Sequence, residues 1–121
     1  MEKTDRELLI KEISSRLPYG IKVQVFGWDE EKGEVAVPLK VYSINTDGYI
    51  SLEYNHYDVE SVYIEDCLLY LRPMSSMTEE EEIAFLNKEN HEIYDWLNAH
   101  HFDYRNLIEK NLALEAPSEM Y

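Results

Sequence analysis

Hydrophobic residues near the start of the chain recur with a helical period. Leu9, Ile13 and Leu17 follow one another at intervals of four residues and form one apolar stripe, which predicts a helix over residues 5–17. Pro18 predicts the end of this helix, because proline lacks the N–H that a helical turn uses and restricts the residue before it.

From residue 21 onward the period changes to two, which is typical of strands that bury one face. Alternating segments, separated by turns, fall at residues 21–25, 35–41, 49–54, 62–64 and 68–71. Five short strands at this spacing predict a small, curved antiparallel sheet or barrel over residues 21–73. Asn45–Gly48 has the composition of a hairpin turn, and Pro38 favours an edge or bulged strand.

Two Thr-x-x-Glu sequences have the spacing of a helix-capping box. Thr4 with Glu7 predicts the start of the first helix, and Thr78 with Glu81 predicts the start of a helix over residues 79–89. A further apolar pattern at helical spacing predicts another helix over residues 92–101.

These patterns predict one α+β domain over residues 1–121, with an N-terminal helix, a five-stranded antiparallel SH3-like curved sheet or barrel, and a helical C-terminal segment over residues 74–121. We expect Trp96, Leu97 and Phe102 of that segment to be buried against the rest of the domain. The expected core consists of Leu9, Ile13, Leu17, Val23, Val25, Val37, Leu39, Val41, Ile50, Leu52, Val62, Ile64 and Leu71.

The charge of the chain limits its partners. Lys and Arg number 11 and Asp and Glu number 25, so the formal net charge is −14. This acidity disfavours direct nucleic-acid binding, which depends on basic residues. Residues 74–121 alone carry −8. We interpret them as a solvated acidic face, or else as a surface for a protein partner with a basic or neutral patch. The extreme form of the second interpretation is an inhibitor that mimics the charge of DNA.

The sequence offers little for catalysis. Cys67 is the single cysteine, and the charges of Glu65 and Asp66 before it are expected to raise its pKa, so we interpret it as a core residue. The four glycines build neither a phosphate-binding loop nor a dinucleotide fingerprint. The favoured hypothesis is therefore a non-enzymatic interaction or accessory protein without a cofactor.

Three of the four histidines lie close together in the sequence, which raises the question of a metal site. His91 and His100 face opposite sides of a continuous helix, whereas His91 and Asp95 share a face. Two ligands do not make a zinc site, so we expect no bound metal and interpret the histidines as packed or capping residues. The alternative hypothesis is a small metal-dependent hydrolase that uses His100, His101 and Asp103.

Strand parity places three of the ten tyrosines together. If the apolar positions face the core, Tyr42, Tyr49 and Tyr63 lie on the outer side of the sheet. One interpretation is that they form cross-strand pairs or are covered by the C-terminal helices; the other is an exposed patch for a protein partner. The carboxylates around this patch, which would steer a partner by charge, are Asp47, Glu53, Asp58 and Glu60.

No long apolar segment is present in the sequence. The longest apolar runs, such as Val35–Leu39 and Cys67–Leu71, have five residues, whereas a membrane helix needs about 20. The charged N-terminus is not followed by the apolar region of a signal peptide. We therefore expect a soluble, cytoplasmic protein that does not bind membranes.

Three segments, Leu17–Gly20, Tyr70–Glu81 and Asp95–Arg105, resemble a group of small uncharacterised proteins encoded by gut anaerobes and by their prophages or mobile elements. The resemblance implies a phage-like, cytoplasmic context and carries no activity. At Asn106 and Asn111 the similar proteins typically have glycine. Asparagine tolerates a left-handed backbone better than most residues, so we predict a positive φ at Asn111.

Overall fold

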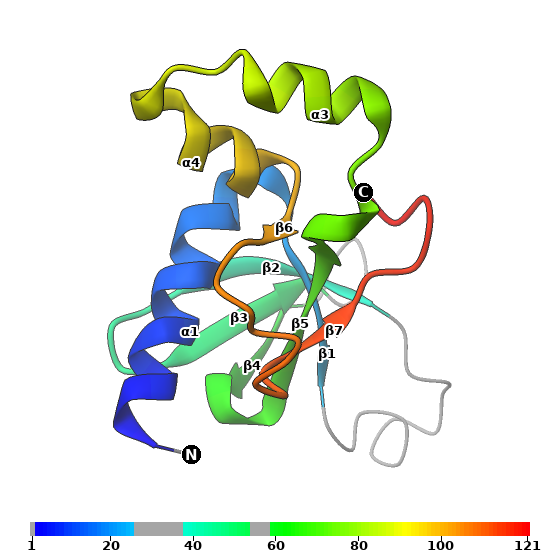
Figure 1. Cartoon of the computed structure of the whole chain (residues 1–121). Helices are drawn as coiled ribbons and strands as arrows, with labels where there is room; N and C mark the ends of the chain where they lie inside the picture. The colour runs from blue at the N-terminus through cyan, green and yellow to red at the C-terminus, as the bar shows by residue number, and fades with distance from the viewer. Residues whose placement is uncertain (1, 26–37, 54–58) are drawn as a thin grey trace.

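The computed structural model describes residues 2–25, 38–53 and 59–121, apart from the side chains of Val59 and Glu60. The chain forms an α+β fold in which helix α1 lies against one face of a mixed sheet, and further helices follow after the fifth strand (Figure 1). None of the helices in this part of the chain is long and apolar enough to span a membrane.

Helix α1 spans Lys3–Arg16, close to the predicted range, and a 3-10 turn over Leu17–Tyr19 follows it. The capping box predicted at Thr4 is wrong, because the helix begins at Lys3, two residues earlier than predicted, and no side chain caps it. A tertiary contact holds the first turn instead, since Arg6 forms an ion pair with Glu65, close to the start of the fifth strand.

Five strands pair in the antiparallel order β4-β3-β2-β1-β5. They are β1 (Lys22–Val25), β2 (Leu39–Ile44), β3 (Tyr49–Glu53), β4 (Val59–Tyr63) and β5 (Cys67–Pro73). The alternation of apolar and polar residues predicted a strand at each of these places, although residues 35–37 of the second one lie outside the described residues. Over the described residues the sheet is open rather than closed into a barrel.

Two short strands near the C-terminus make the sheet mixed. Strands β6 (Phe102–Asp103) and β7 (Ala113–Glu115) pair in parallel with β5. Over the described residues, strand β1 pairs with Cys67–Leu69 of β5. The backbone groups on the opposite edge of β5, and those in its C-terminal half, are therefore available to pair with other segments. The expectation of a purely antiparallel sheet is therefore wrong at this edge.

The predicted turn between β2 and β3 is confirmed. The side-chain oxygen of Asn45 accepts hydrogen bonds from the backbone N–H groups of Asp47 and Tyr49, at 3.0 and 3.1 Å. Gly48 has a φ of 86°, and a Cβ atom there would collide with the guanidinium group of Arg6. The turn therefore needs glycine for its backbone angle, and a side chain at this position would also displace the side chain of Arg6.

The core lies between α1 and the sheet and extends to the C-terminal segment. Of the predicted core residues, Leu17 and Val62 are partly buried and Val37 lies outside the described residues; the others are buried. Leu107 and Leu112 join the core from the C-terminal segment. The buried cluster consists of Leu9, Ile13, Ile21, Val23, Val25, Leu39, Val41, Ile50, Leu52, Ile64, Cys67, Leu69, Leu71, Leu107, Leu112 and Ala113.

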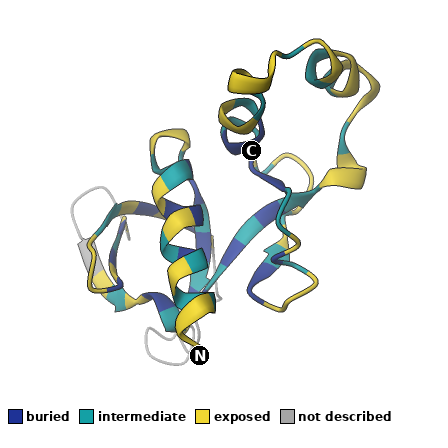
Figure 2. Cartoon of the chain, turned by 60° about the vertical axis from the view of Figure 1, so that its left-hand side comes forward, coloured by how far each residue is buried: buried dark blue, intermediate teal, exposed yellow. Residues whose placement is uncertain are grey.

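Helices α3 (Glu79–Leu86) and α4 (Asn90–Ala99) form near their predicted positions, with α3 ending three residues early. The capping box of Thr78 and Glu81 is confirmed. Helix α4 contacts α1, whereas α3 stands away from the sheet in both views (Figures 1 and 2). The two helices therefore form a projecting part of the molecule that has mostly exposed residues.

The docking predicted for the C-terminal segment is largely confirmed. Leu97 and Phe102 are buried, and Trp96 is half-buried. The Trp96 ring stacks at 5.8 Å from the ring of Phe102. The predicted positive φ at Asn111 is also confirmed, at 61°.

Candidate interaction surfaces

The three tyrosines that strand parity predicted to point outward are exposed. Tyr42 on β2, Tyr49 on β3 and Tyr63 on β4 are 65%, 39% and 50% exposed. The C-terminal helices leave this side of the sheet open, so the interpretation in which they cover the tyrosines is wrong. We call these three residues the tyrosine face.

Two members of the tyrosine face form a cross-strand pair, as the other part of that interpretation predicted. Tyr49 and Tyr63 are register partners with ring centroids 4.4 Å apart, and the Tyr49 hydroxyl donates to the Tyr63 oxygen at 2.6 Å. This hydrogen bond raises the pKa of Tyr49, with a smaller effect of the charges of Asp47 and Glu65. The Tyr49 hydroxyl therefore keeps its proton at neutral pH.

Tyr42 lies on a bulge. The register between β2 and β3 shifts between Val41 and Ser43, so Tyr42 is the extra residue of β2. Ser51 and Ser61 are register partners two positions along from the tyrosine pair, on the same side of the sheet. Small side chains therefore accompany the aromatic rings on this face.

The carboxylates predicted to surround the tyrosine face have unequal surroundings. Asp47 is exposed in the hairpin turn. Glu53 is the register partner of Lys40, whose positive charge offsets its own. Asp58 and the side chain of Glu60 lie outside the described residues. Of the four carboxylates expected around the tyrosine face, Asp47 and Glu53 lie in the described residues with their side chains, and Glu53 is opposite a lysine.

A buried polar network joins α1 to the C-terminal segment. Glu12 and Arg16 are 1% and 0% exposed and form an ion pair one helical turn apart. Arg16 also donates to the carbonyl oxygen of Phe102 at 2.5 Å. Arg105 Nη1 lies 2.9 Å from Glu12 Oε1, in an arrangement that pairs the charges without an aligned hydrogen bond. Both guanidinium groups lie over the ring of Tyr104, at 5.3 and 5.2 Å.

Sequence reasoning missed this network. The spacing of four between Glu12 and Arg16 is a signal for a helical ion pair. Such pairs are usually solvated, however, and nothing local in the sequence indicates that this one is covered by residues about ninety positions later.

His101 is engaged in packing. Its Nε2 atom lies 2.8 Å from the carbonyl oxygen of Tyr19, and its ring stacks on Tyr121 with centroids 3.7 Å apart. Burial, with a smaller contribution from Arg16 and other nearby positive groups, lowers the pKa of His101 to about 4. The neutral ring therefore donates to Tyr19 as part of the structure, as the interpretation of packed histidines predicted.

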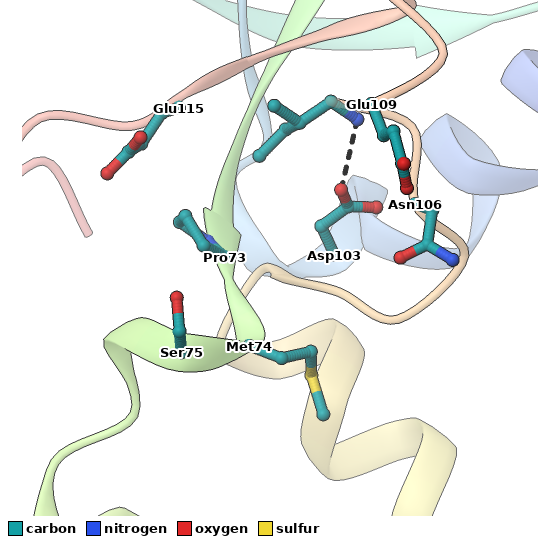
Figure 3. A pocket seen from close by; sticks show the side chains of 8 residues that line it. Pro73, Met74, Ser75, Asp103, Asn106, Glu109 and Glu115 are labelled. Carbon is teal, nitrogen blue, oxygen red and sulfur yellow. Dashed lines mark hydrogen bonds between the residues drawn. The ribbon is translucent and has the colours of Figure 1, made fainter.

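Asp103 lines an open pocket of about 370 Å³ (Figure 3). Its two carboxylate oxygens accept hydrogen bonds from the backbone N–H groups of Leu107, at 2.8 Å, and Ile108, at 3.0 Å. They therefore hold a turn of the backbone. His100 is engaged elsewhere, with Nδ1 3.6 Å from a carboxylate oxygen of Glu81. In the described part of the chain, the three residues of the hydrolase hypothesis do not converge on a shared ligand position.

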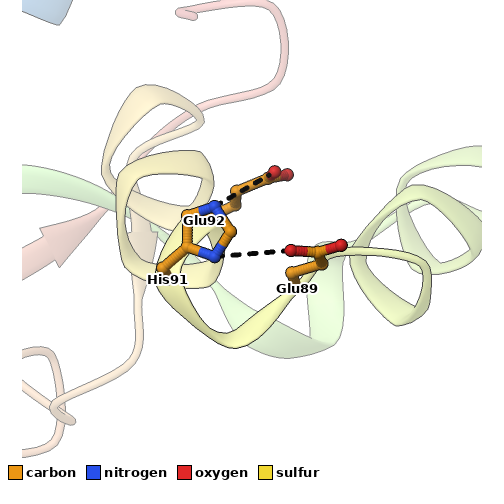
Figure 4. Close-up of side chains that lie close together, drawn as sticks. All are labelled: Glu89, His91 and Glu92. Carbon is orange, nitrogen blue, oxygen red and sulfur yellow. Dashed lines mark ion pairs between the residues drawn. The ribbon is translucent and has the colours of Figure 1, made fainter.

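His91 has two carboxylates close to it (Figure 4). Its Nδ1 atom is 3.5 Å from a carboxylate oxygen of Glu89, and its Nε2 atom is 3.5 Å from one of Glu92. The sequence spacing had instead placed Asp95 on the same side of the helix as His91. All three side chains are exposed. They lie at the N-terminal end of α4, where the helix dipole is positive and opposes a bound cation. These side chains are therefore solvated groups at the end of a helix.

Cys67 is confirmed as a core residue. Its side chain is 1% exposed, and its Sγ atom lies 3.6 Å from the carbonyl oxygen of Tyr63. Burial, together with the charges of Asp66 and Glu65, raises the pKa of the Cys67 thiol to about 12. The thiol therefore stays protonated at neutral pH, which is the unreactive form.

Comparison of the chain with protein-family models, with curated proteins and with solved structures finds no match.

Proposed function

We propose that this protein is a non-enzymatic interaction protein that binds another protein through the tyrosine face. The observation that carries the proposal is the exposure of Tyr42, Tyr49 and Tyr63 on three neighbouring strands. Tyrosine combines a rigid apolar ring with a hydroxyl that tolerates water, and it is enriched at protein interfaces for that reason.

The tyrosine pair supports both apolar contact and a directed hydrogen bond. Because the Tyr49 hydroxyl donates to Tyr63, the Tyr63 hydroxyl keeps its own proton for a further hydrogen bond, which suits a carbonyl group of a partner. The small residues Ser51 and Ser61 beside the pair allow a partner segment to approach the sheet closely. An extended segment or a loop of the partner fits this surface best.

The partner is expected to have a basic or neutral surface. The net charge of −14 attracts such a surface during approach, so the association rate should fall as salt is added. Catalysis is not part of the proposal, because His101, Asp103 and Cys67 are each engaged in contacts that hold the fold.

Two finer features belong to the proposal as well. The order β4-β3-β2-β1-β5, in which the fifth strand returns to the first, supports an SH3-like arrangement of these strands. The assignment to a cytoplasmic protein of a phage-like or mobile element rests on the sequence resemblance and stays a prediction.

Affinity capture from an extract of the native host tests the tyrosine face with three baits. They are the wild-type chain, the double variant Tyr42→Ala/Tyr63→Ala and the control variant Tyr94→Ala, which changes a tyrosine on α4 that is 61% exposed. We expect a partner that the wild type and Tyr94→Ala retain and the double variant loses. All three should stay folded, and the double variant should melt only slightly lower, because it also loses the pair of Tyr49 and Tyr63. Equal capture by the three folded baits would contradict the proposal.

A further inference from the structure

A second apolar surface lies on the projecting C-terminal helices. A groove of about 330 Å³ runs beside α3, and it is lined by Met74, Ser75, Met77, Glu82, Phe85 and Leu86. Leu86 is 71% exposed, and Ile83 on the same helix is 56% exposed. We call this surface, with Ile83 included, the α3 groove. Large apolar side chains clustered at such exposure are typical of interaction sites.

Contacts on the other side of α3 fix its orientation. Arg72 donates to both carboxylate oxygens of Glu81, at 2.7 and 2.6 Å. The ring of Phe85 lies 5.9 Å from the ring of Trp96 on α4. Because these contacts use the inner side of the helix, Leu86 stays on the outer side, where no described element covers it. These contacts hold α3 in place, so the groove has a defined geometry.

Negative charge accompanies these apolar side chains. Helical spacing places Glu79 and Glu82 on the same side of α3 as Leu86, seven and four residues before it. Residues 74–99 carry seven carboxylates and a single lysine. A ligand that covers the groove therefore binds more tightly if it has positive charges on both sides of an apolar strip.

We propose that the α3 groove binds a basic amphipathic helix of a partner protein. The apolar side of that helix covers Leu86 and the methionines, and its lysines or arginines face the carboxylates of Glu79 and Glu82 on α3. Met74 and Met77 suit this role, since flexible thioether side chains adapt to apolar surfaces of different shape. A second copy of this chain is a poor occupant, because it brings a charge of −14 to an acidic surface. This site is separate from the tyrosine face.

The test uses the full chain and a synthetic leucine–lysine helix of about 14 residues, long enough for a marginally stable helix, with its leucines on one side. Calorimetric titration at two salt concentrations measures the dissociation constant. We expect Leu86→Ser to weaken binding about tenfold or more at both concentrations. Glu79→Gln/Glu82→Gln should weaken it chiefly at low salt. Both variants change exposed side chains and should keep the circular dichroism spectrum of the wild type.

Two controls make the result specific. A peptide of the same composition in scrambled order has the charge without the apolar side, and it should bind about tenfold more weakly or worse. Tyr42→Ala should leave the titration unchanged, so failure of the tyrosine face and failure of the α3 groove are distinguishable. The proposal is overturned if the scrambled peptide binds as tightly as the ordered one, if Leu86→Ser binds like the wild type, or if sedimentation reveals a dimer that Leu86→Ser dissociates.

Discussion

The ion pair of Glu12 and Arg16 makes α1 depend on residues from the other end of the chain. Both side chains are almost fully buried, and Arg16 also binds the carbonyl group of Phe102. Removing Arg16 leaves the buried carboxylate of Glu12 with Arg105 as its remaining counter-charge and takes away the donor of the Phe102 carbonyl group. Breaking a buried ion pair in this way costs about 3–5 kcal/mol. We therefore expect Arg16→Met to lower the free energy of unfolding by about this amount in a urea titration.

A double variant checks that the loss comes from the charge. Glu12→Gln/Arg16→Met removes both charges of the pair, so its loss of stability should be smaller than the sum of the losses of the two single variants. Fully additive losses would show that the two side chains act independently, which contradicts their direct contact.

His101 makes the stability of the fold depend on pH. Its pKa is lowered from 6.5 to about 4, chiefly by burial, so the unfolded chain binds a proton at higher pH than the folded chain does. The stabilisation is fully present above pH 6.5 and is lost as the pH falls toward 4. At about 1.4 kcal/mol per pKa unit, the loss over this interval is about 3 kcal/mol.

Urea unfolding at several pH values between 7 and 4 measures this dependence. His101→Gln should unfold with a much weaker dependence on pH in this interval, because it removes the titrating group. His91→Gln is the matched control, since that ring is exposed and its variant should keep the dependence of the wild type. The same slope for His101→Gln and the wild type would refute the assignment.

The elements that the sequence predicted well depend on neighbouring residues. The turn between β2 and β3 follows from Asn45 and Gly48, which lie three positions apart. The start of α3 follows from Thr78 and Glu81, again three positions apart. Each signal specifies its own local geometry, so no distant contact was needed to interpret it.

Elements that depend on distant partners escaped prediction. Strands β6 and β7 are too short to show a period of two. They exist because β5 has unpaired backbone groups in its C-terminal half, which β6 uses, and along the edge opposite β1, which β7 uses. The start of α1 is similar, because the contact between Arg6 and Glu65 outweighs the local preference of Thr4 for a capping position. The sequence pattern predicts neither the pairing with β5 nor the contact between Arg6 and Glu65.

The same difference between local sequence signals and distant contacts applies to the two candidate surfaces. Strand parity predicted which side of the sheet Tyr42, Tyr49 and Tyr63 occupy, but their exposure depends on where the C-terminal helices pack. For α3 the sequence predicted a helix over residues 79–89, but not which side of it faces solvent. Only the packing of Phe85 and its neighbours shows that Leu86 is left outside.

Across the whole molecule, the last residues complete the sheet and the core. Leu112 and Ala113 are buried, and β7 pairs with β5. The hydroxyl of Tyr121 donates to the carbonyl group of Tyr70 at 2.8 Å. We expect a chain that ends after Asn111 to melt at a much lower temperature and to associate through the exposed edge of β5, as measured by circular dichroism and sedimentation.

A substitution at the last residue provides the control. Tyr121→Phe keeps β7, the buried residues and the ring that stacks on His101, and it loses only the contacts of the hydroxyl group, so it should lower the melting temperature only slightly. If the chain that ends after Asn111 stays monomeric and melts like the wild type, β7 does not protect the sheet.

The pairing of β5 with segments from the end of the chain also has a consequence for synthesis on the ribosome. Residues 74–115 must be made after β5 before β7 can join it, which takes about 2 to 8 s at about 5–20 residues per second. During that delay the nascent sheet presents an unprotected strand edge, the kind of surface through which unfinished chains on neighbouring ribosomes associate. The stretch made in this interval includes the seven carboxylates of residues 74–99. Negative charge of this kind disfavours the association of like chains.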